Sequence, residues 1–366
     1  MTRPNNIAEV VRHFEINGEF VAAAPYGSGH INDTYCVVFH WRGTAERVVL
    51  QRINTRIFTR PDALMENIQR VTAHIAQQMA GEPDKNRRVL TLIPTRDGRA
   101  WHVDAGGGYW RAWRFISNTR AYDAVETPEQ AFQAARAFGR FQQLLVSLPP
   151  PRLHDTIPDF HHTPKRFKAL EESIALDAAN RAILAREEIE FARARQPIVG
   201  VLLDANLPER VTHNDTKINN VLLDDATGEG ICVVDLDTVM PGLALYDFGD
   251  MVRTVTSPAS EDERDLSKVF MRMTMFQAMV RGYLDSTASF LTRNEMQLLA
   301  FSGKLITLEM GIRFLADYLA GDTYYKVHRD GHNLDRCRAQ FKLVESIERQ
   351  EEAMNLMVES IAVGNH

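Results

Sequence analysis

The most informative segment of this chain is Val211-Thr212-His213-Asn214-Asp215-Thr216-Lys217-Ile218-Asn219-Asn220-Val221. It has the form H-x-D-x-x-x-x-N and runs directly into an apolar strand. Transfer of a phosphoryl group from a nucleotide to an alcohol needs a carboxylate that accepts the hydroxyl proton and a nearby amide oxygen that binds magnesium. One loop supplies both groups at this spacing. We therefore predict Asp215 as the catalytic base and Asn220 as a metal ligand.

A β-hairpin is predicted directly after this segment. Residues 222–234 contain two apolar runs around a Gly-containing turn, and the return strand would bring Asp235 beside Asn220. Magnesium prefers hard oxygen ligands and takes few of them from the protein, so Asn220 and Asp235 suit it. A literal Asp247-Phe248-Gly249 follows later. It lies beyond an expected turn at Met240-Pro241-Gly242, too far along the chain to close the hairpin, and we expect Asp247 to cap or brace the catalytic loop.

A candidate phosphate cradle lies in the turn Tyr26-Gly27-Ser28-Gly29-His30-Ile31-Asn32. Gly27 and Gly29 would let backbone N–H groups approach phosphate oxygens, and Ser28 adds a hydroxyl. The third glycine of G-x-G-x-x-G is missing and no G-x-x-x-x-G-K-[ST] occurs, which excludes a Rossmann or P-loop site. Alone, this turn is more typical of an ordinary hairpin. Beside the Asp215 segment, we interpret Gly27, Ser28 and Gly29 as nucleotide-binding residues.

Kinase-like sites also place a cation on the third strand, paired with a carboxylate of the next helix. The corresponding stretch here, Val48-Val49-Leu50-Gln51-Arg52, has no lysine. Arg52 is the candidate and Glu66 its expected partner, although a guanidinium is no simple substitute for an ammonium. The sequence leaves open which residue replaces the lysine. Phe115, in Trp113-Arg114-Phe115-Ile116, is a candidate apolar wall for a purine, but plain core aromatics fit this stretch equally well.

The element pattern predicts an α+β protein of two lobes. Short β-branched and aromatic runs dominate residues 1–115, with one helix at about 62–78, whereas residues 116–366 are mainly helical. We expect the first lobe to bind nucleotide and the second to carry the catalytic residues. Helices are expected at about 128–148, 164–176, 178–195 and 334–361, and capping boxes at Ser260 and Thr292 mark two further helix starts.

Composition excludes several classes of protein. The 366 residues include 42 Lys and Arg against 48 Asp and Glu, a net charge of −6, which gives no electrostatic case for a nucleic-acid partner. No apolar run approaches the ~18 residues of a membrane span, and the first residues lack a signal-peptide run. The three cysteines, Cys36, Cys232 and Cys337, lie far apart. We therefore expect a cytoplasmic protein without nucleic-acid or membrane partners, whose oligomeric state is open.

The blocks described above resemble the aminoglycoside phosphotransferase and choline kinase superfamily. Within that superfamily the chain most resembles the N-acetylhexosamine 1-kinases, which phosphorylate amino sugars at the anomeric position. The order of the matching blocks is preserved through nearly the whole chain. They are Tyr26–Asn32, Leu50–Asn54, His213–Asn220, Asp235–Gly242, Tyr246–Asp250 and Leu308–Leu319.

The resemblance implies a bilobal, protein-kinase-like fold that uses ATP and Mg²⁺ to phosphorylate a small sugar. Asp215 would be the base, and the sugar site would be formed by Asp237, Thr238, Arg313 and Tyr324. Two alternatives stay open: a kinase of the same fold for another small alcohol, such as an aminoglycoside or a choline-like compound, and a non-catalytic pseudokinase. The sequence does not distinguish GlcNAc from GalNAc. A sulfatase is disfavoured because no Cys or Ser nucleophile motif occurs.

Overall fold

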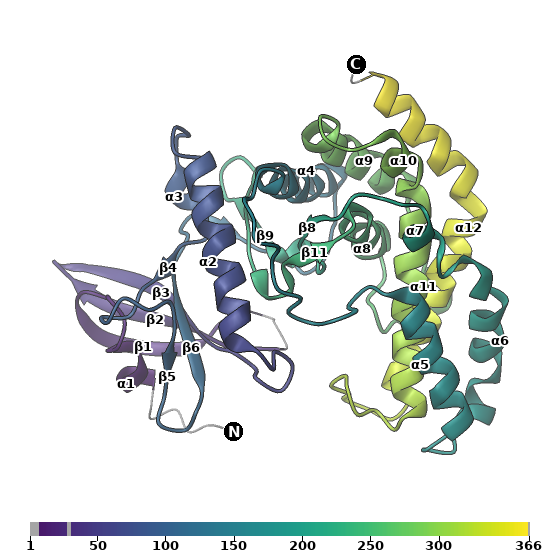
Figure 1. The fold of residues 1–366 in the computed structure, drawn as a ribbon, viewed down its shortest axis with the longest axis horizontal. Helices are drawn as coiled ribbons and strands as arrows, with labels where there is room; N and C mark the ends of the chain where they lie inside the picture. Colours follow the sequence, from purple (N-terminus) through teal and green to yellow (C-terminus); the bar gives the residue numbers. More distant parts are fainter. Residues whose placement is uncertain (1–6, 28–30, 365–366) are drawn as a thin grey trace.

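An antiparallel sheet forms the first lobe of the computed structural model, which describes residues 7–27 and 31–364 (Figure 1). The strand order is β1-β2-β3-β6-β4, and β5 pairs with β6. A short helix, α1 (Ile7–Val11), precedes the sheet, and α3 (Lys85–Arg88) lies before β4. The strands are β1 (Glu19–Pro25), β2 (Asp33–Trp41), β3 (Thr44–Arg52), β4 (Leu92–Ile93), β5 (His102–Val103) and β6 (Tyr109–Arg114).

The two faces of this sheet have different partners. Successive side chains of a strand point to opposite faces, so residues 48 and 50 share one face and residues 49 and 51 the other. Val48 and Leu50 are buried in a cluster with α1. Val49 packs in the main core of the protein together with helix α2 (Pro61–Gln78). Figure 1 shows α2 standing between the sheet and the second lobe.

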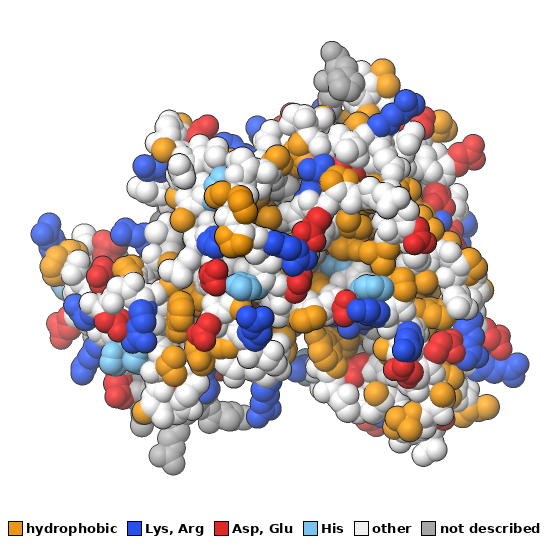
Figure 2. All heavy atoms as spheres, viewed as in Figure 1, with side chains coloured by type: hydrophobic (Ala, Val, Ile, Leu, Met, Phe, Trp, Pro, Cys, Tyr) orange, Lys and Arg blue, Asp and Glu red, His pale blue; other side chains and the backbone are white. Residues whose placement is uncertain are grey.

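Helices dominate the second lobe, around two small sheets. Strand β9 lies between β10 and β7 in one of them, and β8 pairs with β11 in the other. On the face drawn in Figure 2, the surface is indented between the sheet-bearing lobe and the part that carries α5 and α11. The helices are α4 (Pro128–Leu145), α5 (Thr163–Leu176), α6 (Arg186–Ala194), α7 (Val201–Asp204), α8 (Ala244–Thr256), α9 (Met273–Thr287), α10 (Arg293–Gln297), α11 (Leu299–Leu319) and α12 (His332–Gly364), and the strands are β7 (Thr119–Arg120), β8 (Arg210–Thr212), β9 (Val221–Asp224), β10 (Gly230–Val233) and β11 (Met240–Gly242).

The α+β architecture predicted from the sequence is confirmed. Helix α4 begins with the expected Thr127 cap, and the Gln130 side chain completes a capping box by accepting from the Thr127 backbone N–H. Thr292 and Glu295 form the same arrangement at α10. These boxes satisfy backbone N–H groups that a helix start leaves without partners. The lobe boundary at residue 115 stays a prediction.

Three local predictions were wrong. Residues 178–195 form a 3₁₀ turn (Ala182–Ala185) followed by α6 rather than one helix. Residues 240–242 form the short strand β11 rather than a turn. The Ser260 box starts no helix, because the Glu263 carboxylate that would complete it accepts the Asp265 N–H at 2.8 Å instead. The two acidic residues between them form ion pairs, Glu261 with Arg253 and Asp262 with Arg329.

None of the helices in the described part of the chain combines the length and apolar character needed to cross a bilayer. Cys36, Cys232 and Cys337 are all free thiols. Cys232 is buried, and burial raises its thiol pKa to about 12, so this thiol is protonated at neutral pH.

Candidate active site

The predicted catalytic loop, residues 213–220, joins β8 to β9, and Asp247 of α8 fixes its first two residues. The Asp247 carboxylate accepts the backbone N–H groups of His213 at 2.9 Å and Asn214 at 2.7 Å. It also accepts Nε2 of Gln142 at 2.6 Å. Burial raises the pKa of Asp247, and these donors oppose that rise. The prediction that Asp247 braces the loop is confirmed.

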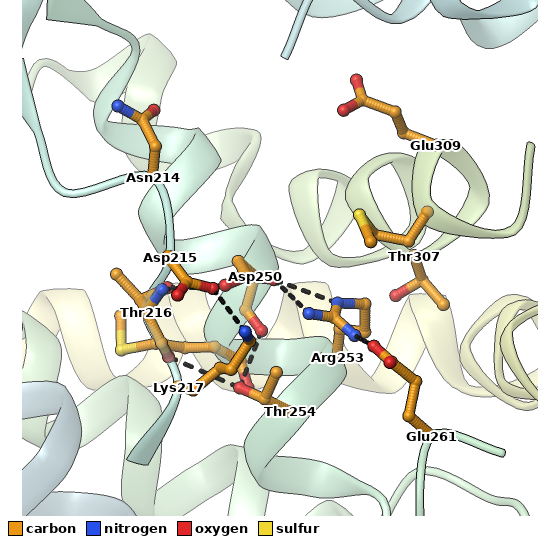
Figure 3. Close-up of polar contacts among 12 residues, drawn as sticks. Asn214, Asp215, Thr216, Lys217, Asp250, Arg253, Thr254, Glu261, Thr307 and Glu309 are labelled. Atoms are coloured by element: carbon orange, nitrogen blue, oxygen red, sulfur yellow. Dashed lines mark hydrogen bonds and ion pairs between the residues drawn. The ribbon is translucent and has the colours of Figure 1, made fainter. Parts of the chain in front are cut away.

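Asp215 lies beside both Lys217 and Asn220. Nζ of Lys217 is 2.8 Å from Oδ1 of Asp215 (Figure 3). Nδ2 of Asn220 donates to Oδ2 at 3.1 Å. Burial acts to raise the pKa of Asp215, but the Lys217 charge outweighs it and the pKa is lowered. Asp215 is therefore an ionised carboxylate that can accept a proton. Because the Asn220 nitrogen is committed to Asp215, the amide oxygen is the atom left to bind a metal.

A second support holds the residue that follows Asp215. Asp250 of α8 accepts the Thr216 N–H at 2.8 Å. Arg253, whose side chain is 5% exposed, lies between Asp250 and Glu261 and donates to both (Figure 3). The loop is thus fixed on either side of Asp215 by carboxylates of α8.

The β9–β10 hairpin delivers Asp235 to the predicted place. The backbone N–H of Val234 donates to the Asn220 carbonyl at 2.9 Å, directly before Asp235. Burial, Asp237 and Asp215 together raise the pKa of Asp235 to about 6. A divalent cation would relieve that clustered negative charge, so the donor set fits magnesium. No cluster of three or more His, Cys, Asp or Glu side chains in residues 7–27 and 31–364 has the arrangement of a metal site, in keeping with the few protein ligands that magnesium takes.

Sequence analysis missed Arg111, the buried cation that joins the two lobes. Its side chain is 1% exposed; Nη1 pairs with Asp237, and Nε donates to Oε1 of Gln51 at 3.0 Å. Gln51 and Arg111 are directly opposite each other on β3 and β6. Asp237 also accepts Nδ2 of Asn32 at 2.5 Å. The missed signal was a charged residue between two tryptophans, Trp110 and Trp113, in the buried middle of strand β6.

The expected pair of Arg52 and Glu66 is not formed. Arg52 has the same parity as Val48 and Leu50 on β3, so its side chain leaves the face that α2 covers. Its guanidinium lies 5.9 Å from the Trp110 ring centroid. Glu66 instead accepts a hydrogen bond from His154 at 2.8 Å. Nucleotide binding by Arg52 and by Glu66 stays a prediction.

Of the predicted nucleotide-binding residues, Phe115 packs near the residue that precedes Gly27. Tyr26, the neighbour of Gly27, has its ring centroid 5.9 Å from that of Phe115. The Arg47 guanidinium covers the Phe115 ring at 3.9 Å. Gly27 has a φ of +83°, a backbone conformation that glycine adopts without strain. Ser28 and Gly29 lie outside the described residues.

Arg313 of α11 sits among aromatic rings on the far side of the catalytic loop. Its side chain is 9% exposed, and Cζ lies 4.9 Å from the Phe160 ring and 5.9 Å from the Tyr325 ring. Tyr324 follows in the turn after α11 and is 56% exposed. The turn is held by Asp317, which accepts the backbone N–H groups of Tyr324 at 2.8 Å and Tyr325 at 3.0 Å.

The remaining predicted sugar-site residues are already hydrogen bonded within the protein. Oγ1 of Thr238 donates to the His213 carbonyl at 2.7 Å. Both carboxylate oxygens of Asp237 accept hydrogen bonds, from Arg111 and Asn32. Their contact with a sugar stays a prediction.

Comparison with known proteins agrees with this geometry. Residues 22–269, about two-thirds of the chain, match the phosphotransferase enzyme family. An aminoglycoside phosphotransferase of Alicyclobacillus acidocaldarius superposes with a TM-score of 0.61 at 13% identity, over 99% of this chain and 96% of its own. The choline kinase of Cryptosporidium parvum gives 0.57 at 14% identity, over 99% and 100%.

A spectinomycin phosphotransferase, solved with ADP and spectinomycin, gives a TM-score of 0.56 at 14% identity, over 99% of this chain and 98% of its own. At such identities the likeness is one of fold, and it extends along both lobes. The family match covers the catalytic loop, the β9–β10 hairpin and α8. This chain belongs to the phosphotransferase enzyme family and has the fold of aminoglycoside phosphotransferases and choline kinases.

Proposed function

We propose that this protein is an ATP-dependent kinase that phosphorylates the anomeric hydroxyl of N-acetylhexosamines, GlcNAc or GalNAc, to give sugar 1-phosphates. The observation that carries the proposal is the ionised Asp215 carboxylate held between Lys217 and Asn220, next to Asp235. The residue blocks shared with N-acetylhexosamine 1-kinases supply the substrate class.

In the proposed reaction Asp215 orients the sugar hydroxyl and accepts its proton as the oxygen attacks the γ-phosphorus, while the bond from that phosphorus to the β-phosphate oxygen breaks and ADP leaves. Asn220 and Asp235 would hold magnesium, whose charge neutralises phosphate oxygens when it is bound. Asp247 and Asp250 keep the loop in place, so little reorganisation accompanies the transfer. Catalysis in this class depends mainly on such positioning and on charge stabilisation.

The charges around Arg313 favour a neutral, hydroxyl-rich acceptor over a cationic one. Burial and the Arg313 charge lower the pKa of Arg166, so two guanidinium groups act on this region. Two nearby carboxylates, Glu309 and Glu261, are already paired, with His161 and Arg253 respectively. A choline or aminoglycoside site would instead need free carboxylates or open aromatic faces for a cation.

The region around Arg313 also contains the phenol group of Tyr325. The Tyr325 hydroxyl is buried and makes no hydrogen bond within the described part of the chain. A buried polar group without a partner is costly, and a ligand hydroxyl would satisfy it. A neutral sugar offers several such groups.

An acceptor panel tests the proposal. Purified protein is given ATP and Mg²⁺ with GlcNAc, GalNAc, glucose, choline, ethanolamine or kanamycin, and ADP release is followed. We expect turnover with the N-acetylhexosamines and a product whose reducing end is blocked, which a reducing-sugar assay detects. Turnover with only the cationic acceptors would replace this proposal with an amino-alcohol or aminoglycoside kinase. If none of these acceptors supports ADP release, the result would favour a non-catalytic pseudokinase.

A further inference from the structure

His161 links the catalytic loop to α11. It lies just before α5, is 5% exposed, and is surrounded by the Phe160 and Tyr246 rings, at 4.7 and 5.2 Å between centroids. Its Nε2 is 3.1 Å from the backbone oxygen of Asn214, and its Nδ1 is 2.9 Å from Oε1 of Glu309. No part of the phosphoryl-transfer chemistry described above uses this histidine.

The partners determine how many protons this group carries. A backbone carbonyl only accepts hydrogen bonds, so Nε2 must carry a proton. The contact between Nδ1 and Glu309 needs one further proton between them. Burial acts to raise the pKa of Glu309, but His161 and Arg313 outweigh it and lower that pKa. His161 therefore donates from Nε2 to the Asn214 carbonyl, and one proton lies between Nδ1 and the Glu309 carboxyl group.

The acceptor of Nε2 is the carbonyl of the residue directly before Asp215. Asn214 has a φ of +65°, a left-handed conformation that costs energy for a residue with a side chain. Asp247 fixes its N–H, and His161 fixes its carbonyl. The plane of the peptide that joins Asn214 to Asp215 is therefore set by His161, and with it the direction from which the Asp215 side chain leaves the backbone.

Glu309 connects this contact to the proposed acceptor site. The Oε1 atom that binds His161 is 4.0 Å from Nη1 of Arg313, one helical turn further along α11. Its other oxygen accepts the Thr163 hydroxyl at 2.6 Å. Figure 3 shows Glu309 on its helix, apart from the Asp215–Lys217 pair. One buried carboxylate thus serves both the loop and the arginine.

We propose that His161 and Glu309 are positioning residues that hold the Asn214–Asp215 peptide in its reactive orientation and couple it to Arg313. The proposal rests on the proposed function only in taking Asp215 as the base. The groups that face His161 are Glu309 from α11, the Asn214 carbonyl from the catalytic loop, and the Tyr246 ring from α8. Burial raises the pKa of Tyr246, so this phenol stays neutral.

His161→Phe tests the contact with a ring of similar size that donates no hydrogen bond. We expect kcat to fall about tenfold or more while KM for ATP is unchanged, because a small misplacement of the base slows only the chemical step. His74→Phe is the matched control. His74 is a buried histidine whose Nε2 lies 3.1 Å from the Leu144 carbonyl, away from the loop, and its loss should leave kcat intact.

Glu309 supplies the conservative rescue. In Glu309→Gln the amide can donate to Nδ1, so neutral His161 still donates from Nε2 to Asn214, and kcat should stay within about threefold. Glu309→Leu removes the orienting contact and should lower kcat as much as His161→Phe. Wild-type kcat in His161→Phe or in Glu309→Leu, measured on folded protein, would overturn the proposal.

A spectroscopic readout separates this proposal from the question of the acceptor. Long-range ¹H–¹⁵N correlation of histidine-labelled protein at pH 7.5 should show a protonated Nε2 of His161 in the wild type and in Glu309→Gln. An unprotonated Nε2 in the wild type would overturn it. If the hexosamines are not phosphorylated, kcat of each variant is measured with whichever acceptor of the panel is phosphorylated, or from ATP hydrolysis in water. The proposed function can then fail while the positioning role of His161 is still tested.

Discussion

Asp247 and Asn214 meet through a 2.7 Å hydrogen bond between the carboxylate of the first and the backbone N–H of the second. Asp247→Asn would present an NH₂ group to one of two backbone donors. We expect the free energy of unfolding to fall by about 1–3 kcal/mol and kcat to fall as well. Urea titration and initial rates measure both. In Asp177→Asn, which replaces a carboxylate that accepts two backbone N–H groups away from the site, kcat should not change.

Arg111→Gln should be among the most destabilising single substitutions in the first lobe. It leaves Asp237, which is 3% exposed, without its buried cation. Removing one partner of such a pair costs about 3–5 kcal/mol. Thermal and urea unfolding should show this loss, and the double variant Arg111→Gln/Asp237→Asn should recover part of it. The control is Arg120→Gln, which removes an exposed ion pair with Asp225. If Arg111→Gln loses no more stability than this control, the ion pair of Arg111 with Asp237 is not important for the fold.

Asp215→Asn should lower kcat by about 10²–10⁴ because the amide cannot accept the proton of the attacking hydroxyl. Stability should change little, since the Lys217 side chain is 43% exposed and can be solvated. Single-turnover rates measure the loss of activity, and the melting temperature measures any change in stability. Asp285→Asn, at an exposed ion pair of α9, serves as the control. Full activity of Asp215→Asn would remove this residue from the mechanism.

Arg313→Lys should raise KM for the acceptor about tenfold and leave KM for ATP unchanged, since a compact ammonium does not reproduce the planar donor fork. Tyr324→Phe should act in the same direction. Steady-state kinetics with each substrate varied in turn separates the two constants. The comparison variant is Arg193→Lys, which alters an exposed pair with Glu171. A rise in KM for ATP instead would place Arg313 on the nucleotide side.

Glu295→Gln probes the bidentate ion pair with Arg210, the residue at the start of β8. Burial acts to raise the pKa of Glu295, but hydrogen bonds from Arg210 and Thr292 lower it. The ionised form therefore stabilises the fold at and above the ordinary glutamate pKa of about 4.3, and this stabilisation is lost as the pH falls through the lowered pKa. We expect a difference from wild type of about 3 kcal/mol at pH 7 that shrinks below pH 4.

Local signals in the sequence were sufficient to predict much of the fold. Helix α4 has its cap, its proline and its apolar period within one continuous stretch, so tertiary contacts had little to add. The β9–β10 hairpin was predictable because Gly228 and Gly230 mark its turn region between two apolar runs. Residues 260–263 failed as a helix start because the Glu263 carboxylate accepts the Asp265 N–H, and Asp262 pairs with Arg329, which is distant in the sequence.

The candidate site divides in the same way. Asp215, Asn220 and Asp235 lie within one short stretch of the sequence. Their spacing, with one hairpin between them, was enough to predict that they lie close together. Arg111 and His161 act through partners 126 and 148 residues away, respectively, and no local pattern encodes such pairings. The alternation of β3 did contain the information that Arg52 faces away from α2, because Leu50, two residues earlier, is a core residue.

Asp317 has a consequence for the engineering of this enzyme. A single buried carboxylate gathers the backbone at residues 323–325, so the ends of this short loop are fixed while the side chain of Tyr324 projects outward. The exposed position 324 can thus be randomised while the hydrogen bonds to Asp317 keep the backbone of this loop in place. A library confined to this position offers a route to variants that accept other small alcohols.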